Sequence, residues 1–280
     1  MNREALKSGF KSMIAARRDS RILRYMASGA EKYLRAYNNV WNWNFRYNGE
    51  ANALRTITTI VAGEVLDVGA NEGQWASMAL EFIDDKRLHC FEAVPQIFEK
   101  LKENVGRHTN ATLNNYGLGS KRGSVEFCFY PDSSDQSSRY GYEMNDGFKK
   151  EKISVRVVPG DEYVSQEKIE EIAFLKLDVE GMEMEVLEGF ASCLQMGVIK
   201  AIQFEHGPLH AMTRHLLRDF LDLFGAHSYT VFKLFPKAFV KLDYDLEKDE
   251  SFAGRNLLAV HSLLLDRLPN LSRFSNNRSI

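Results

Sequence analysis

Two kinds of apolar pattern follow one another along this chain of 280 residues. Beyond about the first 50 residues, short apolar runs of strand length alternate with segments whose apolar residues recur at helical spacing. The first such unit reads as a buried strand at residues 65–68, a glycine-bearing turn at 69–73, and a helix that carries Ala76, Met78 and Leu80. Strands that alternate with helices in this way predict an α/β domain with a mostly parallel sheet.

The same alternation continues toward the C-terminal part of the chain. Further strands are predicted at 87–92, 111–119, 123–130, 153–158, 172–177, 198–206, 228–235 and 255–261, and helices at 95–105 and 182–188. The last two strands are expected to form an antiparallel pair. The polar stretch 131–152 is long for a hairpin connection, so it is either functional or disordered. The hypothesis for this stretch is a flap over the acceptor substrate.

Residues 1–50 follow a different pattern. They are rich in Arg and Lys, carry apolar residues at helical spacing and end in an aromatic segment at 37–47, which predicts two or three amphipathic helices. These helices are interpreted either as a cap packed on the core with a solvated basic face, or as a lid or an anchor that contacts a membrane surface or a partner. The expected division is a helical cap or lid at 1–50, a main domain at 51–265 and a polar tail at 266–280.

Composition is that of an ordinary globular protein, with 44% hydrophobic and 26% charged residues. The net charge of −2 gives no overall preference for nucleic acid, so no nucleic-acid partner is expected. The three cysteines stand far apart, which favours reduced thiols over a disulfide framework. No apolar run approaches the roughly 20 residues that span a bilayer, and the first residues lack the apolar core of a signal peptide. A cytoplasmic location is expected.

The turn at 69–73 carries the first candidate chemistry. A strand that leads into a helix through such a turn points free backbone N–H groups at one spot beyond the strand end. A dinucleotide site has the pattern Gly-x-Gly-x-x-Gly, whereas this loop has Asp67-x-Gly69-x-x-x-Gly73 with a second acid at Glu72. Acids disfavour a phosphate and favour a cationic, amino-bearing ligand such as S-adenosylmethionine. The alternative is an ordinary connection between a strand and a helix.

A second acid stands in register with this turn. Glu92 ends the strand at 87–92, about 20 residues past Gly73, where nucleotide-binding α/β folds place the carboxylate that binds the ribose hydroxyls. A carboxylate can accept the two hydrogen bonds of a vicinal diol side by side. The segment 111–119 is predicted as a strand that ends in a polar turn, and its Asn115 and Tyr116 either border an adenine ring or form a simple turn.

Two further carboxylates follow the strand at 172–177. Asp178 and Glu180 come directly after it, at the edge of the sheet where open α/β folds bind ligands. Such a pair can hold a divalent cation such as Mg²⁺, orient a hydroxyl group or act as a base. It can equally cap the N-terminus of the following helix. The strand at 198–206 repeats the arrangement, because it ends in Glu205 and His206.

The glycine turn, the segment after the second strand and the segment at 174–189 together resemble the FkbM-type S-adenosylmethionine-dependent methyltransferases. The three segments read Val65-Leu-Asp-Val-Gly-Ala-Asn-Glu-Gly73, Phe91-Glu-Ala-Val-Pro95 and Phe174-Leu-Lys-Leu-Asp-Val-Glu-Gly-Met-Glu-Met-Glu-Val-Leu-Glu-Gly189. The run Leu-Lys-Leu-Asp-Val-Glu-Gly is the most specific part, and the resemblance covers roughly residues 60–262. It implies a Rossmann-like class I fold with a seven-stranded, mostly parallel sheet and an antiparallel last strand.

The resemblance also implies O-methylation of a hydroxyl group on a sugar, a glycan or a natural product. It places Asp67, Gly69, Asn71 and Gly73 around the methionine side of the cofactor and Glu92 on its ribose. Asp178 and Glu180 are expected to face the reacting centre.

An alcohol becomes a good nucleophile only when it loses its proton. His206 is the first candidate for the base, and Asp178 and Glu205 are the other predicted catalytic residues. The alternative is a Mg²⁺ ion, held by Asp178 and Glu180, that lowers the pKa of the alcohol.

Three other functions remain to be weighed. A nicotinamide-dependent oxidoreductase is disfavoured because the third glycine of its fingerprint is missing. A nucleic-acid methyltransferase is disfavoured by the near-neutral charge and by the lack of an Asn/Asp-Pro-Pro-aromatic run. A catalytically silent, methyltransferase-like module in a biosynthetic complex is the third alternative. The expected acceptor is a small molecule or a glycan, and the sequence leaves the oligomeric state open.

Overall fold

The computed structural model describes residues 3–131 and 149–268 and divides the chain into two compact units, Met1–Asn42 and Trp43–Ile280. The interior of the expected flap, 132–148, and the tail from 269 onward lie outside the described residues. Among the residues that are described, no helix is both long and apolar enough to cross a membrane.

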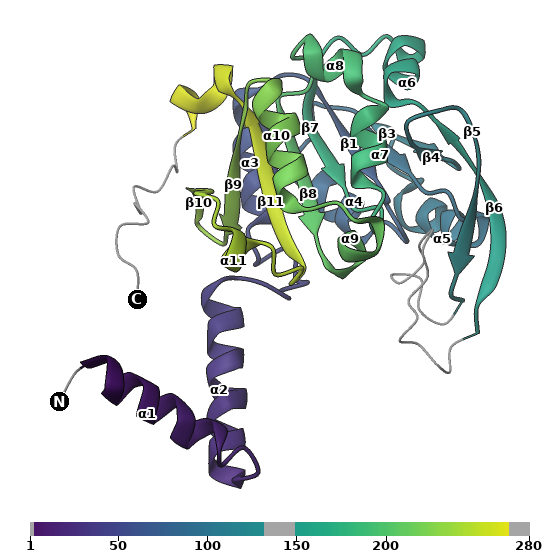
Figure 1. Ribbon diagram of the computed structural model, residues 1–280. Helices are drawn as coiled ribbons and strands as arrows, with labels where there is room; N and C mark the ends of the chain where they lie inside the picture. The colour runs from purple at the N-terminus through teal and green to yellow at the C-terminus, as the bar shows by residue number, and fades with distance from the viewer. Residues whose placement is uncertain (1–2, 132–148, 269–280) are drawn as a thin grey trace. The chain divides into compact units, whose positions relative to one another are not determined.

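The larger unit is built on an eight-stranded sheet (Figure 1) with the strand order β10-β9-β11-β8-β7-β1-β2-β3. Its strands are β1 (Glu64–Val68), β2 (Leu88–Phe91), β3 (Ala111–Asn114), β7 (Ile172–Leu177), β8 (Ala201–His206), β9 (Tyr229–Phe235), β10 (Ala238–Lys241) and β11 (Arg255–His261). The five strands from β3 to β8 are parallel, and β11 runs antiparallel to both β8 and β9. The predicted fold class is confirmed, and β10 adds an edge strand to the expected seven.

The strand order reverses at β1, which lies between β2 and β7. From β1 the chain winds outward to β2 and β3, and it later returns to β7 on the other side of β1. Loops that leave β1 and β7 at their carboxyl ends therefore lead to helices α4 (Gln74–Leu80) and α7 (Glu183–Glu188) on opposite faces of the sheet. Ligands of open α/β sheets bind at such a reversal point.

Helices cover both faces of the sheet because successive strand residues point to opposite sides. One apolar cluster packs α3 (Glu50–Ile60), α4 (Gln74–Leu80) and α5 (Pro95–Val105) against the sheet. A second cluster packs α6 (Gly160–Glu167), α7 (Glu183–Glu188), α8 (Ala191–Gln195) and α10 (Leu217–Ala226) against the other face. Short helices α9 (Pro208–Thr213), α11 (Leu246–Asp249) and η2 (Ser262–Arg267) follow later strands.

A second, three-stranded sheet was not anticipated as a separate body. It has the order β4-β6-β5 and consists of β4 (Gly117–Leu118), β5 (Gly123–Phe129) and β6 (Glu151–Val158). The sequence predicts one strand at 111–119, but β3 ends at Asn114 and the chain changes sheets at Asn115 and Tyr116. The ring of Tyr116 packs edge-on against Phe91, with the Arg156 guanidinium 5.0 Å from its centre, which fixes this break.

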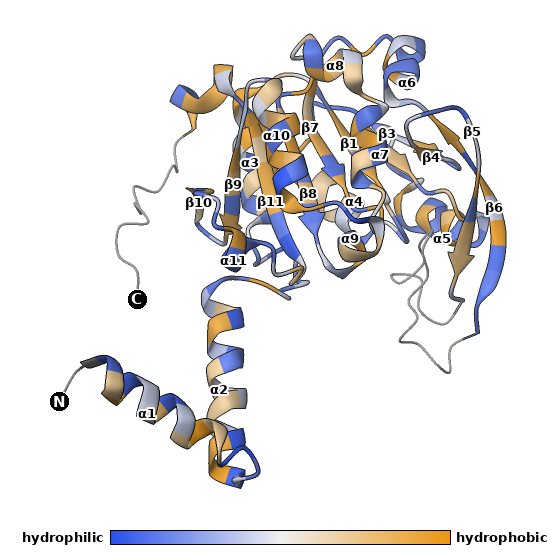
Figure 2. Cartoon of the chain, viewed as in Figure 1, coloured by the Kyte–Doolittle hydropathy of each residue, from blue (hydrophilic) through white to orange (hydrophobic). Residues whose placement is uncertain are grey.

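The smaller unit contains the amphipathic helices that the N-terminal pattern predicts. They are α1 (Arg3–Ala15) and α2 (Arg21–Tyr37), and no residue of α2 is buried. Blue and orange residues alternate along both helices in Figure 2, as expected for helices with a polar and an apolar side.

Candidate functional site

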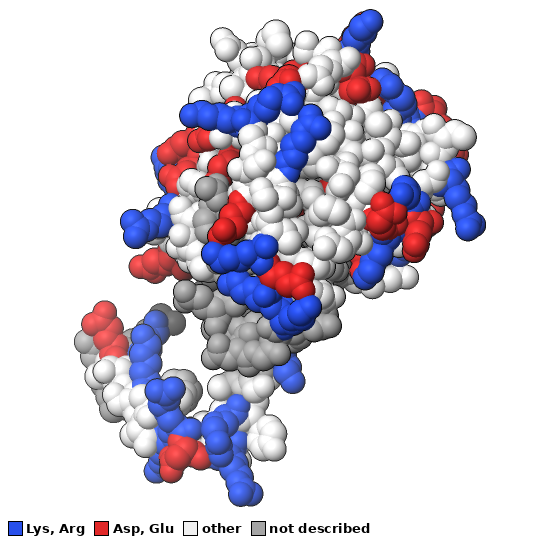
Figure 3. All heavy atoms as spheres, turned by 90° about the vertical axis from the view of Figure 1, so that its right-hand side faces the viewer, with Lys and Arg blue, Asp and Glu red and all other residues white. Residues whose placement is uncertain are grey.

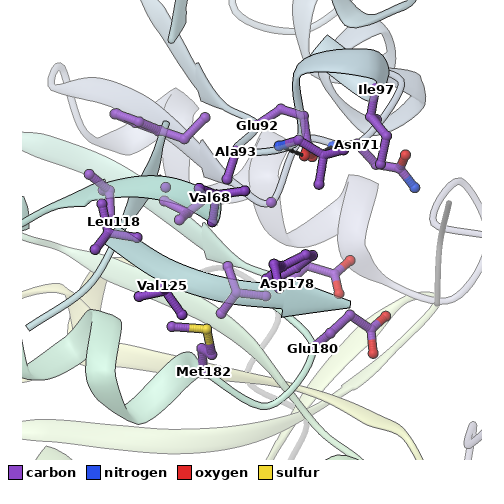
Figure 4. A pocket seen from close by; sticks show the side chains of 18 residues that line it. Val68, Asn71, Glu92, Ala93, Ile97, Leu118, Val125, Asp178, Glu180 and Met182 are labelled. Carbon is purple, nitrogen blue, oxygen red and sulfur yellow. Dashed lines mark hydrogen bonds between the residues drawn. The ribbon is translucent and has the colours of Figure 1, made fainter. Parts of the chain in front are cut away.

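A pocket opens at the carboxyl ends of β1, β2 and β7, at the reversal point of the sheet (Figure 4). The last residues of β1 and β2, the loops after the three strands, helix α5 and the second sheet all contribute to its wall. The lining residues are Val68, Gly69, Asn71, Phe91, Glu92, Ala93, Val94, Ile97, Gly117, Leu118, Val125, Phe127, Val155, Val157, Asp178, Val179, Glu180 and Met182. The wall is thus largely apolar, with carboxylates and an amide at the strand ends.

The two glycines of the turn after β1 are needed for different contacts. Gly69 has φ +85°, and a Cβ there would lie 1.9 Å from the backbone oxygen of Asp178. Gly73 has φ +87°, and a Cβ there would approach the side chains of Val105 and Leu101 on α5 to 2.7 and 2.8 Å. Gly69 therefore lets the ends of β1 and β7 meet at the pocket, whereas Gly73 lets helix α5 pack against the turn.

Glu92 connects this turn to the segment after β2. Its Oε2 accepts a hydrogen bond from the Asn71 N–H at 3.0 Å, and its Oε1 accepts one from the Val94 N–H at 2.8 Å. Burial raises the pKa of Glu92 to about 7, although the two amide donors act in the opposite direction. Glu92 and Asn71 also line the pocket, on the same wall in Figure 4. One carboxyl group thus fixes the turn and reaches the cavity.

Asn115 lies beside this wall rather than in it. Its Nδ2 donates a hydrogen bond to the backbone oxygen of Glu92 at 3.0 Å, and it is not among the lining residues. The amide therefore fixes the strand end that carries Glu92. Ile97 and Leu118 are among the apolar residues that line the pocket.

The loop after β7 forms the wall across from Glu92. The Asp178 side chain is 42% exposed and accepts a hydrogen bond from Lys176 Nζ at 3.1 Å. Glu180 lines the same pocket and has φ +53°, a left-handed conformation that is uncommon for a residue with a Cβ. In Figure 4 the two carboxylates extend in the same direction. The predicted neighbours Asn71, Glu92, Asp178 and Glu180 thus surround one cavity.

Glu183 holds this second loop, although it is not among the site residues predicted from the sequence. Its Oε1 accepts from the Val179 N–H and its Oε2 from the Gly181 N–H, both at 3.0 Å. Glu183 is almost completely buried, and its Oε2 lies 2.9 Å from His210 Nε2. An acid in the first turn of a helix that follows a tight loop is a capping signal, and this signal was present in the sequence.

A row of buried polar side chains runs behind the pocket. Asp67 on β1, Lys176 on β7 and Gln203 on β8 are direct cross-strand neighbours. Lys176 Nζ lies 3.4 Å from Asp67 Oδ1 and 5.5 Å from the centre of the Trp75 ring. Burial raises the pKa of Asp67 more than Lys176 lowers it. Burial lowers the pKa of Lys176, but Asp178, Asp67 and a further acid raise it more strongly.

That further acid is Glu50, at the start of α3. Its carboxylate accepts hydrogen bonds from Asn48 Nδ2 and Gln203 Nε2 at 2.6 Å each, and from Asn256 Nδ2 at 3.0 Å. Burial raises the pKa of Glu50. Residue 50 closes the N-terminal region in the sequence-based division, yet its side chain belongs to the polar interior of the larger unit. Two of these partners, Gln203 and Asn256, stand more than 150 residues away, so no local pattern could indicate those contacts.

Glu205 and His206 end β8 but are not lining residues of this pocket. Burial and the nearby carboxylates of Asp178 and Glu183 raise the pKa of Glu205 well above its usual range. A Cβ on either Gly207 or Gly254 would lie 3.0 Å from Glu205 Oε1, so the two glycines leave room for this carboxyl group.

His206 is 2% exposed and lies in an aromatic cluster. Its ring centre is 4.8 Å from that of His210 and 5.1 Å from that of Phe252. Its Nε2 lies 3.3 Å from the His215 carbonyl oxygen, which can only accept, so Nε2 carries the proton of the neutral ring. Burial and His210 lower the pKa of His206 to about 4. The ring is therefore neutral at pH 7, and its access to the cavity remains a prediction.

Asp178 and Glu180 are the carboxylates that the sequence offers for a metal. Within residues 3–131 and 149–268, no group of three or more His, Cys, Asp or Glu side chains is placed to hold a metal ion. Mg²⁺ is often bound through one or two carboxylates with water and substrate oxygens completing its shell. The side chains present therefore allow only that open type of site.

Comparison with known proteins gives a family match over most of the larger unit, Trp43–Ile280. The family model of the methyltransferase FkbM domain matches residues 67–230. The chain is 27% identical over 157 residues to the hexuronic acid methyltransferase AglP of Haloferax volcanii. The matched region covers 55% of this chain and 62% of the relative. It is 24% identical over 139 residues to the 2-O-methyltransferase NoeI of Sinorhizobium fredii, and this match covers 45% of this chain and 56% of the relative.

The matches to these curated relatives thus span less than two thirds of each relative's length. Among solved structures, the crystal structure of methyltransferase FkbM from Methylobacillus flagellatus is similar with a TM-score of 0.45 and 16% identity. That similarity covers 70% of this chain and 43% of the other.

Proposed function

Because the chain belongs to the FkbM methyltransferase family, we propose that it transfers a methyl group from S-adenosylmethionine to a hydroxyl group of a sugar or glycan. One observation carries this proposal: a single pocket at the reversal point joins Glu92 and Asn71 on one wall to Asp178 and Glu180 on another. The names of the two relatives, a hexuronic acid methyltransferase and a 2-O-methyltransferase, support the acceptor class.

The wall around Glu92 fits the adenosine part of the cofactor. Each oxygen of Glu92 already accepts one backbone amide, and a carboxylate oxygen has a second lone pair for a ribose hydroxyl. Ile97, Leu118 and Val125 add apolar surface for a purine ring. S-adenosylmethionine, when bound, supplies a methyl group that is already activated by its sulfonium. The protein then has to align the acceptor and accept its proton.

Asp178 is the group that we propose to contact the acceptor hydroxyl. Its partly exposed carboxylate lines the pocket, and Lys176 holds one of its oxygens. Glu180, on the same side of the cavity, is placed to orient a second hydroxyl of a polyol. His206 and Glu205 remain candidates for accepting the proton through a chain of hydrogen bonds, and Mg²⁺ at Asp178 and Glu180 remains the alternative for activating the alcohol.

Calorimetric titration of S-adenosylmethionine and NAD into the full chain tests the cofactor. We expect S-adenosylmethionine to bind and NAD not to bind. Val125→Trp should weaken binding by about 10-fold or more, since a large side chain at this lining position fills space that the ligand needs. Ser124→Trp is the matched control, because residue 124 is exposed on the other side of the same strand.

A screen of sugar and uronic-acid acceptors, with and without added magnesium, tests the reaction. Transfer of a labelled methyl group that needs no magnesium supports direct proton removal, and strict dependence on magnesium supports the metal alternative. Absence of S-adenosylmethionine binding would overturn the proposed cofactor. Binding without turnover, together with a stable partner protein, would favour the silent binding module.

A further inference from the structure

The N-terminal helices differ from the rest of the molecule in charge. Residues 1–42 contain nine Lys or Arg and three Asp or Glu, a net charge of +6. The whole chain has a net charge of −2, so residues 43–280 have a net charge of −8. The charged atoms of the N-terminal helices are mainly blue in Figure 3, whereas blue and red are interspersed over the visible face of the larger unit. The segment 1–42 thus has a net positive charge, whereas the rest of the chain has a net negative charge.

Helix α2 separates its apolar and basic residues onto two sides. At about 100° per residue, Ile22, Met26, Tyr33 and Tyr37 fall within about 60° of one another around the helix axis. Together with Tyr25 these side chains are between 64% and 80% exposed. The basic residues of the opposite side are Arg21, Arg24, Lys32 and Arg35, and each is three or eight positions from the next. The helix therefore presents a large apolar stripe on one side and a basic stripe on the other.

Helix α1 repeats this arrangement over a shorter length. Leu6, Phe10 and Met13 are spaced four and three residues apart and are each about half exposed or more. Lys7 and Lys11 stand four residues apart on the adjoining side of the helix.

Both helices thus combine exposed apolar residues with nearby cations. This combination, with aromatic residues on the apolar stripe, is typical of helices that lie in the interface of a bilayer. Tyr places its ring at the apolar boundary and its hydroxyl in the headgroup region.

We propose that α1 and α2 bind the surface of a bilayer that contains anionic lipids and lie flat in its headgroup region. An interface with a second copy would oppose +6 to +6, whereas an anionic surface attracts this segment and repels the rest of the chain, so the charge distribution favours the membrane. Neither helix has the length and apolarity of a membrane span. This inference goes beyond the proposed methyl transfer and does not depend on it.

Flotation of the full chain with vesicles tests the proposal. We expect binding to vesicles of phosphatidylcholine with phosphatidylglycerol, strong weakening of this binding in high salt, and little binding to pure phosphatidylcholine. Each basic residue near an anionic surface strengthens binding by about 5-fold, so Arg21→Glu with Arg24→Glu should weaken it by at least about 20-fold. Ile22→Asp with Met26→Asp should weaken it by at least about 10-fold, since an apolar stripe must enter the interface.

Lys237→Glu with Lys241→Glu provides the matched charge reversal, because both lysines are exposed on the larger unit. This control should bind vesicles nearly as well as the unchanged chain. Circular dichroism checks that every variant keeps its helices. Calorimetry with S-adenosylmethionine, whose proposed pocket lies within the larger unit, checks the cofactor site separately, so membrane binding and the proposed activity can fail independently.

Equal binding to neutral and anionic vesicles would overturn the proposal, as would unchanged binding of both helix variants. Analytical ultracentrifugation gives a second decisive outcome. A dimer that disappears with Ile22→Asp and Met26→Asp, in a protein that ignores vesicles, would show that a second copy occupies the apolar stripe.

Discussion

The two loops that border the pocket are fixed in the same way but used differently. The turn after β1 is held by Glu92, and the loop after β7 is held by Glu183; each glutamate accepts one backbone amide on each oxygen. Glu92 directly follows the neighbouring strand β2 and also lines the pocket. Glu183 comes from the helix that its own loop enters, is buried, and does not line the pocket. Glu92 thus both holds its loop and lines the pocket, whereas after β7 Glu183 holds the loop and other residues line the pocket.

This difference has a consequence for how each wall tolerates change. On the Glu92 side, any substitution alters the loop and the proposed ribose contact together. On the Glu183 side, the loop can be perturbed while Asp178 and Glu180 keep their carboxylates. Lys176 connects the two sides, because it lies between Asp67 of β1 and Asp178 after β7.

Removing that connection should give the largest effect. Lys176→Met leaves the fully buried Asp67 without its cation and removes the partner of the partly exposed Asp178, and the loss at Asp67 should lower the free energy of unfolding by about 3–5 kcal/mol. Urea unfolding measures this. Lys100→Met, which removes an exposed lysine paired with Glu72, is the control and should change stability by less than about 1 kcal/mol.

Adding Asp67→Asn to Lys176→Met should restore part of the lost stability, since a neutral amide replaces the uncompensated charge. No recovery in the double variant would show that Lys176 stabilises the sheet through packing rather than through charge.

Replacing each of the two glutamates sharpens the comparison. Glu92→Gln and Glu183→Gln each exchange one acceptor oxygen for an amino group that faces a backbone N–H. Each change should therefore lower the free energy of unfolding by about 1–3 kcal/mol. Only Glu92→Gln should also weaken S-adenosylmethionine binding, by about 10-fold or more.

Parallel unfolding and calorimetric measurements on these two variants separate the roles. If Glu183→Gln weakened cofactor binding as much as Glu92→Gln, the separation of holding and binding in the second loop would be wrong.

The smallest effect concerns pH. The pKa of Glu92 is raised to about 7 in the folded protein, so this carboxyl is half ionised near neutral pH. A diol is bound by the ionised form, hence affinity for S-adenosylmethionine should rise by up to about 10-fold from pH 6 to pH 8. The effect of Glu92 on the free energy of unfolding has the opposite sign, because the folded state binds this proton more tightly than the unfolded state does. The stabilising contribution of the bound proton is fully present below pH 4.5 and is lost as the pH rises through 7.

Calorimetry across this pH range, repeated with Glu92→Gln, isolates the contribution. The variant should show a flatter profile because it cannot ionise at this position. An equally steep profile would assign the pH dependence to another group, for example Glu205, whose pKa is also raised.

The sequence predicted the positions of four residues that line the pocket at strand ends. Asn71, Glu92, Asp178 and Glu180 were expected at the carboxyl ends of neighbouring strands, and parallel strands bring those ends to one edge. The local pattern of apolar runs and glycines was sufficient for this.

The contributions from distant segments could not be predicted. Alternation at 123–130 and 153–158 indicates strands but not the sheet that they join, so the apolar wall with Val125 was missed. Glu50 reads as the end of a helical cap, although Gln203 and Asn256 bind it from across the chain. His206 was placed correctly at its strand end, but only tertiary packing shows that its ring lies among aromatic residues.

The buried row of Asp67, Lys176 and Gln203 also specifies the register in which the central strands pair. Strands built only of Val, Leu and Ile pair almost equally well after a slip of two residues, because such a slip keeps every side chain on its own face. Here a slip of β7 along β1 would place Asp67 beside Phe174 or Asp178 instead of Lys176 and leave a buried charge unmatched. The residues behind the pocket thus specify the one alignment in which the pocket exists.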